Sequence, residues 1–157
     1  MNTTVKADSA TLKAAAEVFT STLDRIKEFE GVVFSLTLQP YPLPLLQKCI
    51  SAGGNATGLS PDTGPLVSIL VLMNWKNKED DDQIIALAKA LVQRIKTDAT
   101  ARGQAVPYTY MNYAFGFQNP IGSYGAESKA LLQRVSTRYD PEGIFQKGCS
   151  DGFKLFV

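Results

Sequence analysis

The side chains best suited to chemistry are phenols, hydroxyls and amides that recur at every second position in two segments. In 108–113, which we expect to form a strand, Tyr108, Tyr110 and Asn112 share one face, because successive side chains of a strand point to opposite sides. In the predicted strand 32–41 the same period separates an apolar face from a polar one, whose members are Ser35, Thr37, Gln39 and Tyr41. Hydrogen-bonding groups beside flat rings can orient an oxygenated organic molecule.

These polar sets are expected to meet on one side of a sheet, where Lys6 and Ser68 would join them from two further strands. The side chains that we predict to bind a substrate there are Lys6, Thr37, Gln39, Tyr41 and Tyr108. The alternative is that this side is only the solvated outer face of an antiparallel sheet, which is normally polar.

Several kinds of catalytic site are excluded or disfavoured by residue type. The chain has no histidine, which excludes Ser-His-Asp and Cys-His mechanisms. Cys49 and Cys149 are therefore expected to be small, buried, reduced side chains. The acidic run 79–82 fits the start of a helix better than a metal site, because consecutive helical residues diverge. The acidic run therefore gives no reason to expect a bound metal. No glycine-rich stretch matches a GxGxxG or Walker loop, so no nucleotide cofactor is expected to bind through such a loop.

Length and composition predict one domain, residues 1–157, because 157 residues with 45% apolar content can bury one core. The net charge of +1 gives no electrostatic reason to expect binding to nucleic acid or to an anionic membrane. No apolar stretch approaches the roughly 20 residues of a membrane span. The first eight residues contain no apolar signal segment, so we expect a cytoplasmic protein.

The hydrophobic pattern predicts strand, helix, strand, strand, helix, strand and a final helix. Asp8 or Ser9 is suited to cap the first helix, and Trp75 is expected to pack in the core at the end of a buried strand. The four strands are expected at 2–7, 32–41, 66–75 and 108–113, and the final helix at 127–139. This order is that of an α+β, ferredoxin-like fold, a βαββαβ antiparallel sheet with helices on one face, plus a C-terminal helix.

Motifs along nearly the whole chain resemble the C-terminal segment of fungal FAD-linked oxidases of the berberine-bridge-like, PCMH flavoprotein family. The matching pieces are 38–40, 53–59, 64–67, 74–75, 107–113, 116–125, 139–146 and 152–155. Members of that family also carry a larger N-terminal domain that holds the flavin, often through a His and a Cys. The resemblance therefore implies the substrate-side part of a flavoenzyme, which binds FAD only if a separate flavin domain supplies it.

Tyr110 and Asn112 match the family's Tyr-x-Asn motif. In the family the Asn lies near the flavin ring and the Tyr lines the substrate cavity. Carried over to this chain, the match implies that Tyr110 can still act as an acid or hydrogen-bond donor, whereas Asn112 would have lost its flavin partner. These two residues are the predicted catalytic pair.

Three functions are compatible with these observations. The first is a flavin-free, non-redox cyclase, pericyclase or isomerase of fungal secondary metabolism, acting on a polyketide- or alkaloid-like substrate held in a reactive shape. The second is a subunit or fragment that completes an FAD-linked oxidoreductase. The third is a binding protein for a hydrophobic metabolite.

A homodimer is expected. In the family the open face of the sheet looks at the flavin, and an open face without that cover can be buried by a second copy of the chain. The terminal segment offers a second contact surface if it is extended, since Phe153, Leu155 and Val157 would then lie on one side.

Overall fold

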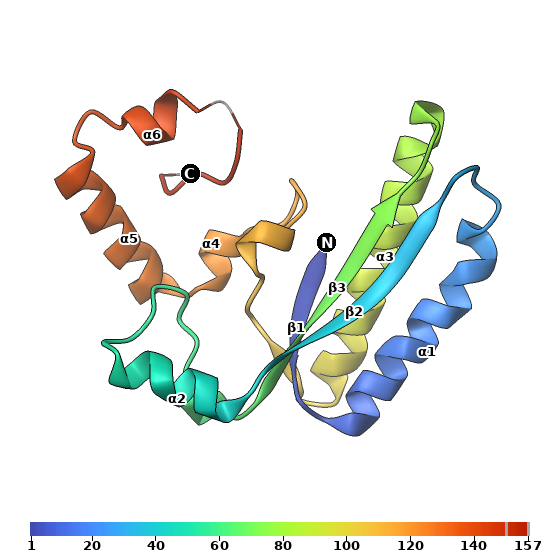
Figure 1. Cartoon of the computed structure of the whole chain (residues 1–157), viewed down its shortest axis with the longest axis horizontal. Helices are drawn as coiled ribbons and strands as arrows, with labels where there is room; N and C mark the ends of the chain where they lie inside the picture. The colour runs from blue at the N-terminus through green and yellow to red at the C-terminus, as the bar shows by residue number, and fades with distance from the viewer. Residues whose placement is uncertain (150, 157) are drawn as a thin grey trace.

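A computed structural model of the chain describes residues 1–149 and 151–156 and places four antiparallel strands in one sheet (Figure 1). The strands are β1 (Asn2–Lys6), β2 (Val33–Tyr41), β3 (Leu66–Asn74) and β4 (Ala105–Val106), in the order β2-β3-β1-β4. This is the strand order of the ferredoxin-like fold, so the prediction of fold class is confirmed.

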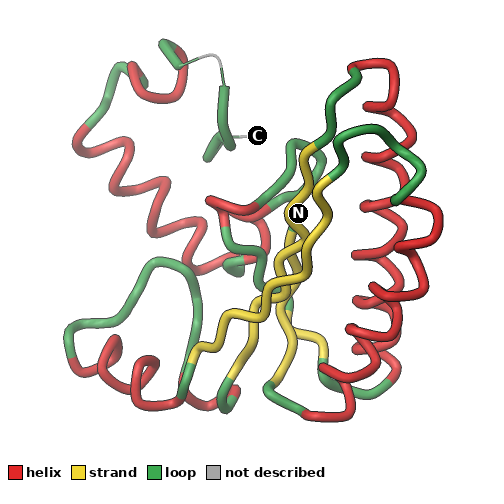
Figure 2. Tube along the Cα trace, turned by 45° about the vertical axis from the view of Figure 1, so that its right-hand side comes forward, coloured by secondary structure: helices red, strands yellow, loops and turns green. Residues whose placement is uncertain are grey.

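Two long helices, α1 (Ser9–Ile26) and α3 (Asp81–Ala101), cover one face of the sheet (Figure 2). Asp8 caps α1 as predicted, because its Oδ2 accepts a hydrogen bond of 2.8 Å from the Thr11 amide. The apolar side of β2 faces these helices, and the rings of Phe19 and Phe34 stack at 5.4 Å. The buried core between sheet and helices contains Val5, Ala15, Val67, Ile69, Val71, Ala88, Leu91 and Ile95.

Trp75 lies just beyond β3 and is half-buried. Its indole nitrogen donates a 2.7 Å hydrogen bond to Oδ1 of Asp81, the first residue of α3. A short 3-10 helix, η2 (Lys78–Asp80), precedes α3, so the acidic run does lie at a helix start. Its carboxylates can there complement the positive end of the helix dipole.

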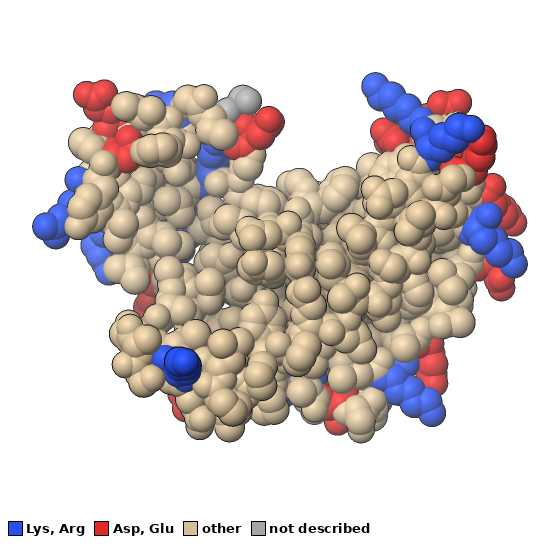
Figure 3. Space-filling view, in the orientation of Figure 1, with Lys and Arg blue, Asp and Glu red and all other residues tan. Residues whose placement is uncertain are grey.

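The opposite side of the sheet carries shorter helices (Figure 1). They are α2 (Leu43–Ser51), η1 (Pro61–Thr63), α4 (Pro120–Ser123), α5 (Ala126–Tyr139) and α6 (Ile144–Lys147). We call residues 120–149 and 151–156 the C-terminal lobe. Between this lobe and the sheet the surface is hollowed and carries few charged side chains (Figure 3). Within the described ranges, no helix combines the length and apolar character needed to cross a bilayer.

The prediction of a fourth strand at 108–113 is wrong. Strand β4 contains only Ala105 and Val106, and residues 111–113 form a 3-10 helix, η3 (Met111–Tyr113). Pro107 follows β4 directly and has no amide to continue the ladder with β1. We call the segment 107–119 the strap, because it leaves the sheet edge and runs to the C-terminal lobe.

Two side-chain amides replace the missing strand pairing. The Tyr110 amide donates to Asn2 Oδ1 at 2.8 Å, and Asn2 Nδ2 donates to the Tyr110 carbonyl at 3.0 Å. In turn, Gln118 Nε2 donates to the Asn2 carbonyl at 2.7 Å, and the Asn2 amide donates to Gln118 Oε1 at 3.2 Å. The strap is thereby fixed to the edge of β1 without being a strand.

A glycine-rich loop reaches the C-terminal lobe from the other direction. Asn55 organises the loop, since its Oδ1 accepts from the Thr57 amide at 3.0 Å and its Nδ2 donates to the Leu59 carbonyl at 2.9 Å. Gly58 has a φ of 73°, and a Cβ atom there would lie 2.2 Å from the backbone oxygen of Tyr124. Only glycine permits this approach.

The end of the chain folds back on the C-terminal lobe, so the expectation of an extended, exposed tail is wrong. The Leu155 amide donates to Gln146 Oε1 at 2.9 Å, and Gln133 Nε2 donates to the Leu155 carbonyl at 2.7 Å. Phe153 and Leu155 are half-buried as a result, while Val157 lies outside the described residues.

The two cysteines differ in exposure. Cys49, on α2, is half-buried, whereas Cys149 is exposed. The expectation that both are buried is therefore wrong for Cys149 and only partly met by Cys49. Cys149 lies just beyond the end of α6 and is not a member of the described hydrophobic core.

We expect Asn2→Ala to lower the free energy of unfolding by about 2 kcal/mol, because it leaves the Tyr110 amide and carbonyl without their partner. Urea unfolding at equilibrium measures this change. Gln47→Ala, at an exposed position of α2, is the matched control and should stay within about 0.5 kcal/mol of the parent. Equal stabilities of the two variants would show that the amide exchange does not hold the strap.

We expect Gly58→Ala to be less stable than Gly53→Ala by about 2 kcal/mol, since overpacking against backbone cannot be relieved by a rotamer change. Gly53 is the matched control: it also has positive φ (103°), but a Cβ atom there meets nothing within 4 Å. Thermal or urea unfolding of both variants separates the steric clash from the shared cost of the left-handed backbone. Equal losses would contradict the close approach to Tyr124.

Candidate functional site

The strap carries the predicted catalytic pair and lies in contact with Gln39, a predicted binding residue on β2. Asn112 Nδ2 donates to the Tyr110 hydroxyl at 2.9 Å, and the rings of Tyr110 and Tyr113 meet edge to face at 4.9 Å. Gln39 Nε2, from β2, donates to the Tyr113 hydroxyl at 3.1 Å. A side-chain network therefore joins strand β2 to the strap over the polar face of the sheet.

Tyr113 is one of the residues of this region that the sequence did not predict. A strand through 108–113 would have pointed it away from Tyr110, whereas the 3-10 turn of η3 brings the two rings into contact. Pro107 was the available signal, since a proline there makes a continuous ladder through 108–113 unfavourable.

A second group of rings lies beside the first. The ring of Tyr108 meets that of Tyr41 edge to face at 6.0 Å and stacks on that of Tyr124 at 5.6 Å. Tyr108 and Tyr124 are buried, and Tyr41 is half-buried. We call the five residues together the tyrosine cluster: Tyr41, Tyr108, Tyr110, Tyr113 and Tyr124.

Burial changes the acidity of three members of the cluster. Desolvation raises the pKa of Tyr108, and the neighbouring Tyr41 phenol raises it further, so Tyr108 stays neutral under all ordinary conditions. Desolvation also raises the pKa of Tyr41 and of Tyr124. These phenols can therefore donate hydrogen bonds, but they are poor bases at neutral pH.

Two buried hydroxyls lie on the same side of the sheet. Thr4 and Ser68 pair in register across β1 and β3, and Ser68 also pairs with Gln39 of β2. Both residues are fully buried, and neither hydroxyl has a hydrogen-bond partner among the described residues. Ser68 thus does join the polar face, as its position in the sequence predicted.

The remaining predicted residues lie further from the network. Thr37 is on the same face of β2 as Gln39 but is exposed. Lys6 is exposed at the end of β1. It pairs with Leu66 of β3, which in turn pairs with Tyr41 of β2. Both share the predicted face, and no hydrogen bond from either side chain reaches the tyrosine cluster within the described structure.

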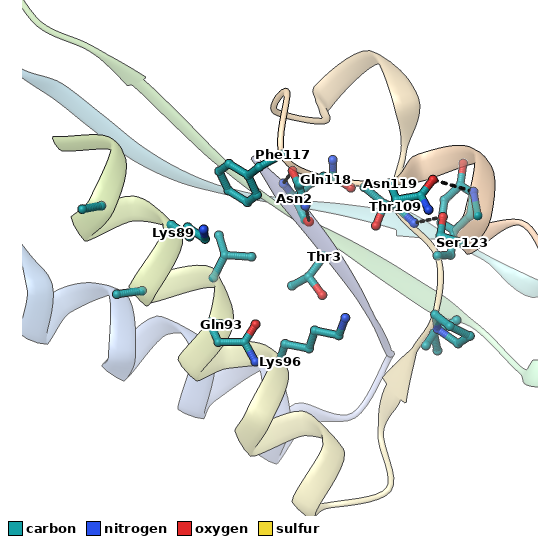
Figure 4. Close-up of a pocket in the computed structure, with 17 residues that line it drawn as sticks. Asn2, Thr3, Lys89, Gln93, Lys96, Thr109, Phe117, Gln118, Asn119 and Ser123 are labelled. Atoms are coloured by element: carbon teal, nitrogen blue, oxygen red, sulfur yellow. Dashed lines mark hydrogen bonds between the residues drawn. The ribbon is translucent and has the colours of Figure 1, made fainter. Parts of the chain in front are cut away.

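A separate cavity of about 760 Å³ lies at the edge of the sheet, between α3 and the strap (Figure 4). Asn2 and Thr3 form its floor. Of the residues predicted from the sequence, Tyr108 alone lines it. The structure therefore contains two possible binding regions, and the sequence pointed to the tyrosine cluster only.

Comparison with known proteins relates the chain to part of larger fungal proteins. No protein-family model matches it, and no solved structure matches it. An FAD-dependent monooxygenase of Fusarium proliferatum, FUP4, is 32% identical over 97% of this chain and 30% of its own length. An FAD-dependent monooxygenase of Cochliobolus heterostrophus, tpcD, is 38% identical over 85% of this chain and 25% of its own.

A third relative has a different name. The oligopeptidase PhomG' of Diaporthe leptostromiformis is 35% identical over 92% of this chain but only 12% of its own length. The chain thus spans less than a third of the curated relatives that it matches. It is similar to a segment of fungal proteins, several of which are named FAD-dependent monooxygenases.

Proposed function

We propose that this chain forms the substrate-binding side of a fungal FAD-linked oxidoreductase of the berberine-bridge-like type. The observation that carries the proposal is the convergence of phenol and amide side chains from β2 and the strap on one face of the sheet. A flat, oxygenated organic molecule, such as a polyketide or an alkaloid, suits a face of stacked rings with a few placed donors.

The hydrogen bonds leave two phenol protons free for a substrate. The Tyr110 oxygen accepts from Asn112, and the Tyr113 oxygen accepts from Gln39. Each phenol can then donate its own proton to a substrate oxygen, and an accepted hydrogen bond strengthens the donor. In this proposal Tyr110 polarises a substrate carbonyl or supplies a proton, while Asn112 and Gln39 fix the two hydroxyls.

The same groups fit only part of a flavin. Phenols and amides can bond the polar edge of the isoalloxazine ring, but the tyrosine cluster adds no cation or glycine-rich loop for a pyrophosphate. FAD, when bound, would accept a hydride from the substrate. Its nucleotide would be held by another domain, in keeping with relatives more than three times as long as this chain.

A second candidate is a flavin-free cyclase, pericyclase or isomerase. It is favoured by the assembly of the Tyr110–Asn112 and Tyr113–Gln39 pairs from residues of this chain alone. Such a protein would hold a flexible substrate in a reactive shape and polarise it from Tyr110, with no change in oxidation state. The chain would then need no flavin domain for turnover.

We expect Tyr110→Phe to reduce turnover about 100-fold if the hydroxyl donates in the transition state. Asn112→Ala should cause a smaller loss, because the phenol remains. Ser21→Ala, which removes an exposed hydroxyl from α1 far from both proposed surfaces, is the control and should be unchanged. The assay uses the metabolic intermediate that accumulates when the gene is deleted.

Turnover is measured with and without the flavin-holding part of FUP4, and flavin absorption is recorded in both samples. Activity that needs the flavin domain supports the oxidoreductase, and activity without it supports the cyclase. Full turnover in both Tyr110→Phe and Asn112→Ala would show that the pair is structural, and the proposed roles would be wrong.

The C-terminal lobe has an exposed apolar surface that another protein domain could cover. Helix α5 buries none of its residues, and apolar side chains on α5, α6 and the chain end are exposed. They are Leu131, Val135, Tyr139, Ile144, Phe145 and Phe156. We propose that the flavin-holding domain covers this surface, and that a second copy covers it in a homodimer when that domain is absent.

We expect Phe145→Ser to weaken association at least tenfold, because an aromatic side chain that is 78% exposed is a natural interface anchor. Ile50→Ser, at a side chain that is 50% exposed on α2, is the control and should have no effect. Sedimentation of the chain alone, and with the flavin-holding part of FUP4, measures both kinds of contact. A wild-type chain that stays monomeric in both samples would rule out this interface.

A further inference from the structure

The cavity between α3 and the strap has an electrostatic character that the tyrosine cluster lacks. Two lysines of α3, Lys89 and Lys96, line it, and no acidic side chain of the described structure does. Neither lysine forms an ion pair with a described residue. The cavity therefore presents uncompensated positive charge to whatever enters it.

Thr3 adds a hydroxyl group to the lining of this cavity. Thr3 lies at the edge of β1 and is almost fully buried, yet its side chain lines the cavity (Figure 4). In Figure 4 the side chains of Thr3 and Lys96 point toward one another, with Gln93 beside Lys96. The Thr3 hydroxyl lines the cavity beside Lys96, so it can donate to a ligand oxygen that the Lys96 ammonium also binds.

The rest of the lining is mostly apolar. Phe117 is 47% exposed, and Lys89 Nζ lies 4.7 Å from the centre of its ring. This cation–π contact holds the ring at the cavity wall. Val92, Val106 and Pro107 supply further apolar surface. A ligand suited to this cavity would place a flat apolar body among these side chains and an anionic group near Lys96 and Thr3.

We propose that this cavity binds a small organic carboxylate with a flat, apolar body. A carboxylate has two oxygens that can bond the Lys96 ammonium and the Thr3 hydroxyl together. The volume of about 760 Å³ is in the range of small-molecule sites. The site is distinct from the Tyr110 network and does not depend on the function proposed for it.

Cinnamate is a suitable probe, and cinnamamide is its neutral counterpart of nearly the same shape. Titration of isotope-labelled protein, followed by amide chemical shifts, locates binding and gives an affinity. We expect shifts at Thr3, Gln93 and Gly122, and about tenfold tighter binding of cinnamate than of cinnamamide, since each exposed lysine contributes modestly. Added salt should reduce that preference.

Lys96→Gln should weaken cinnamate binding about threefold and leave cinnamamide unchanged. Arg94→Gln is the matched control, because it removes one positive charge from the same helix outside the cavity. Circular dichroism confirms that both variants keep the fold. Equal affinity for the two probes, equal effects of the two substitutions, or no binding of either probe would each overturn the proposal.

Discussion

The exchange of hydrogen bonds between Asn2, Gln118 and Tyr110 is the interaction on which the functional half of the molecule depends. The sheet and its two covering helices follow from long apolar patterns, but β4 ends after two residues at Pro107. Beyond that point the backbone would leave the edge of β1 with unpaired polar groups. Two side-chain amides satisfy those groups and determine where the strap runs.

The course of the strap produces two binding regions from one segment. On one side the Tyr113 hydroxyl accepts a hydrogen bond from Gln39 over the polar face of the sheet, and on the other side the strap lines the cavity that faces α3. Tyr108 belongs to both regions, as a member of the tyrosine cluster and as a lining residue of the cavity.

Much of the fold could be predicted because its signals are local and periodic. The cap at Asp8, the alternation in β2 and the apolar run of β3 each belong to a short stretch of sequence. The strap could not be predicted in the same way, since Asn2 lies 108 positions from Tyr110 and 116 from Gln118. The shared face of Gln39 and Ser68 was predicted correctly, yet the contact of Tyr113 with Tyr110 requires the turn of η3.

The hydrophobic core lies between the sheet and the helices α1 and α3, and the C-terminal lobe contributes little to it. The main hydrophobic cluster contains no residue beyond Phe115, and α5 buries none of its own. Beyond Pro120, Ile121 and Tyr124, the described part of the C-terminal lobe buries few apolar side chains, so we expect the amide hydrogens of α5 and α6 to exchange with solvent through local opening. Those of β3, whose first six residues are buried, can exchange only when the whole sheet unfolds. We therefore expect amide exchange to be slow in the sheet and faster in the C-terminal lobe, although the lobe supplies Tyr124 to the tyrosine cluster.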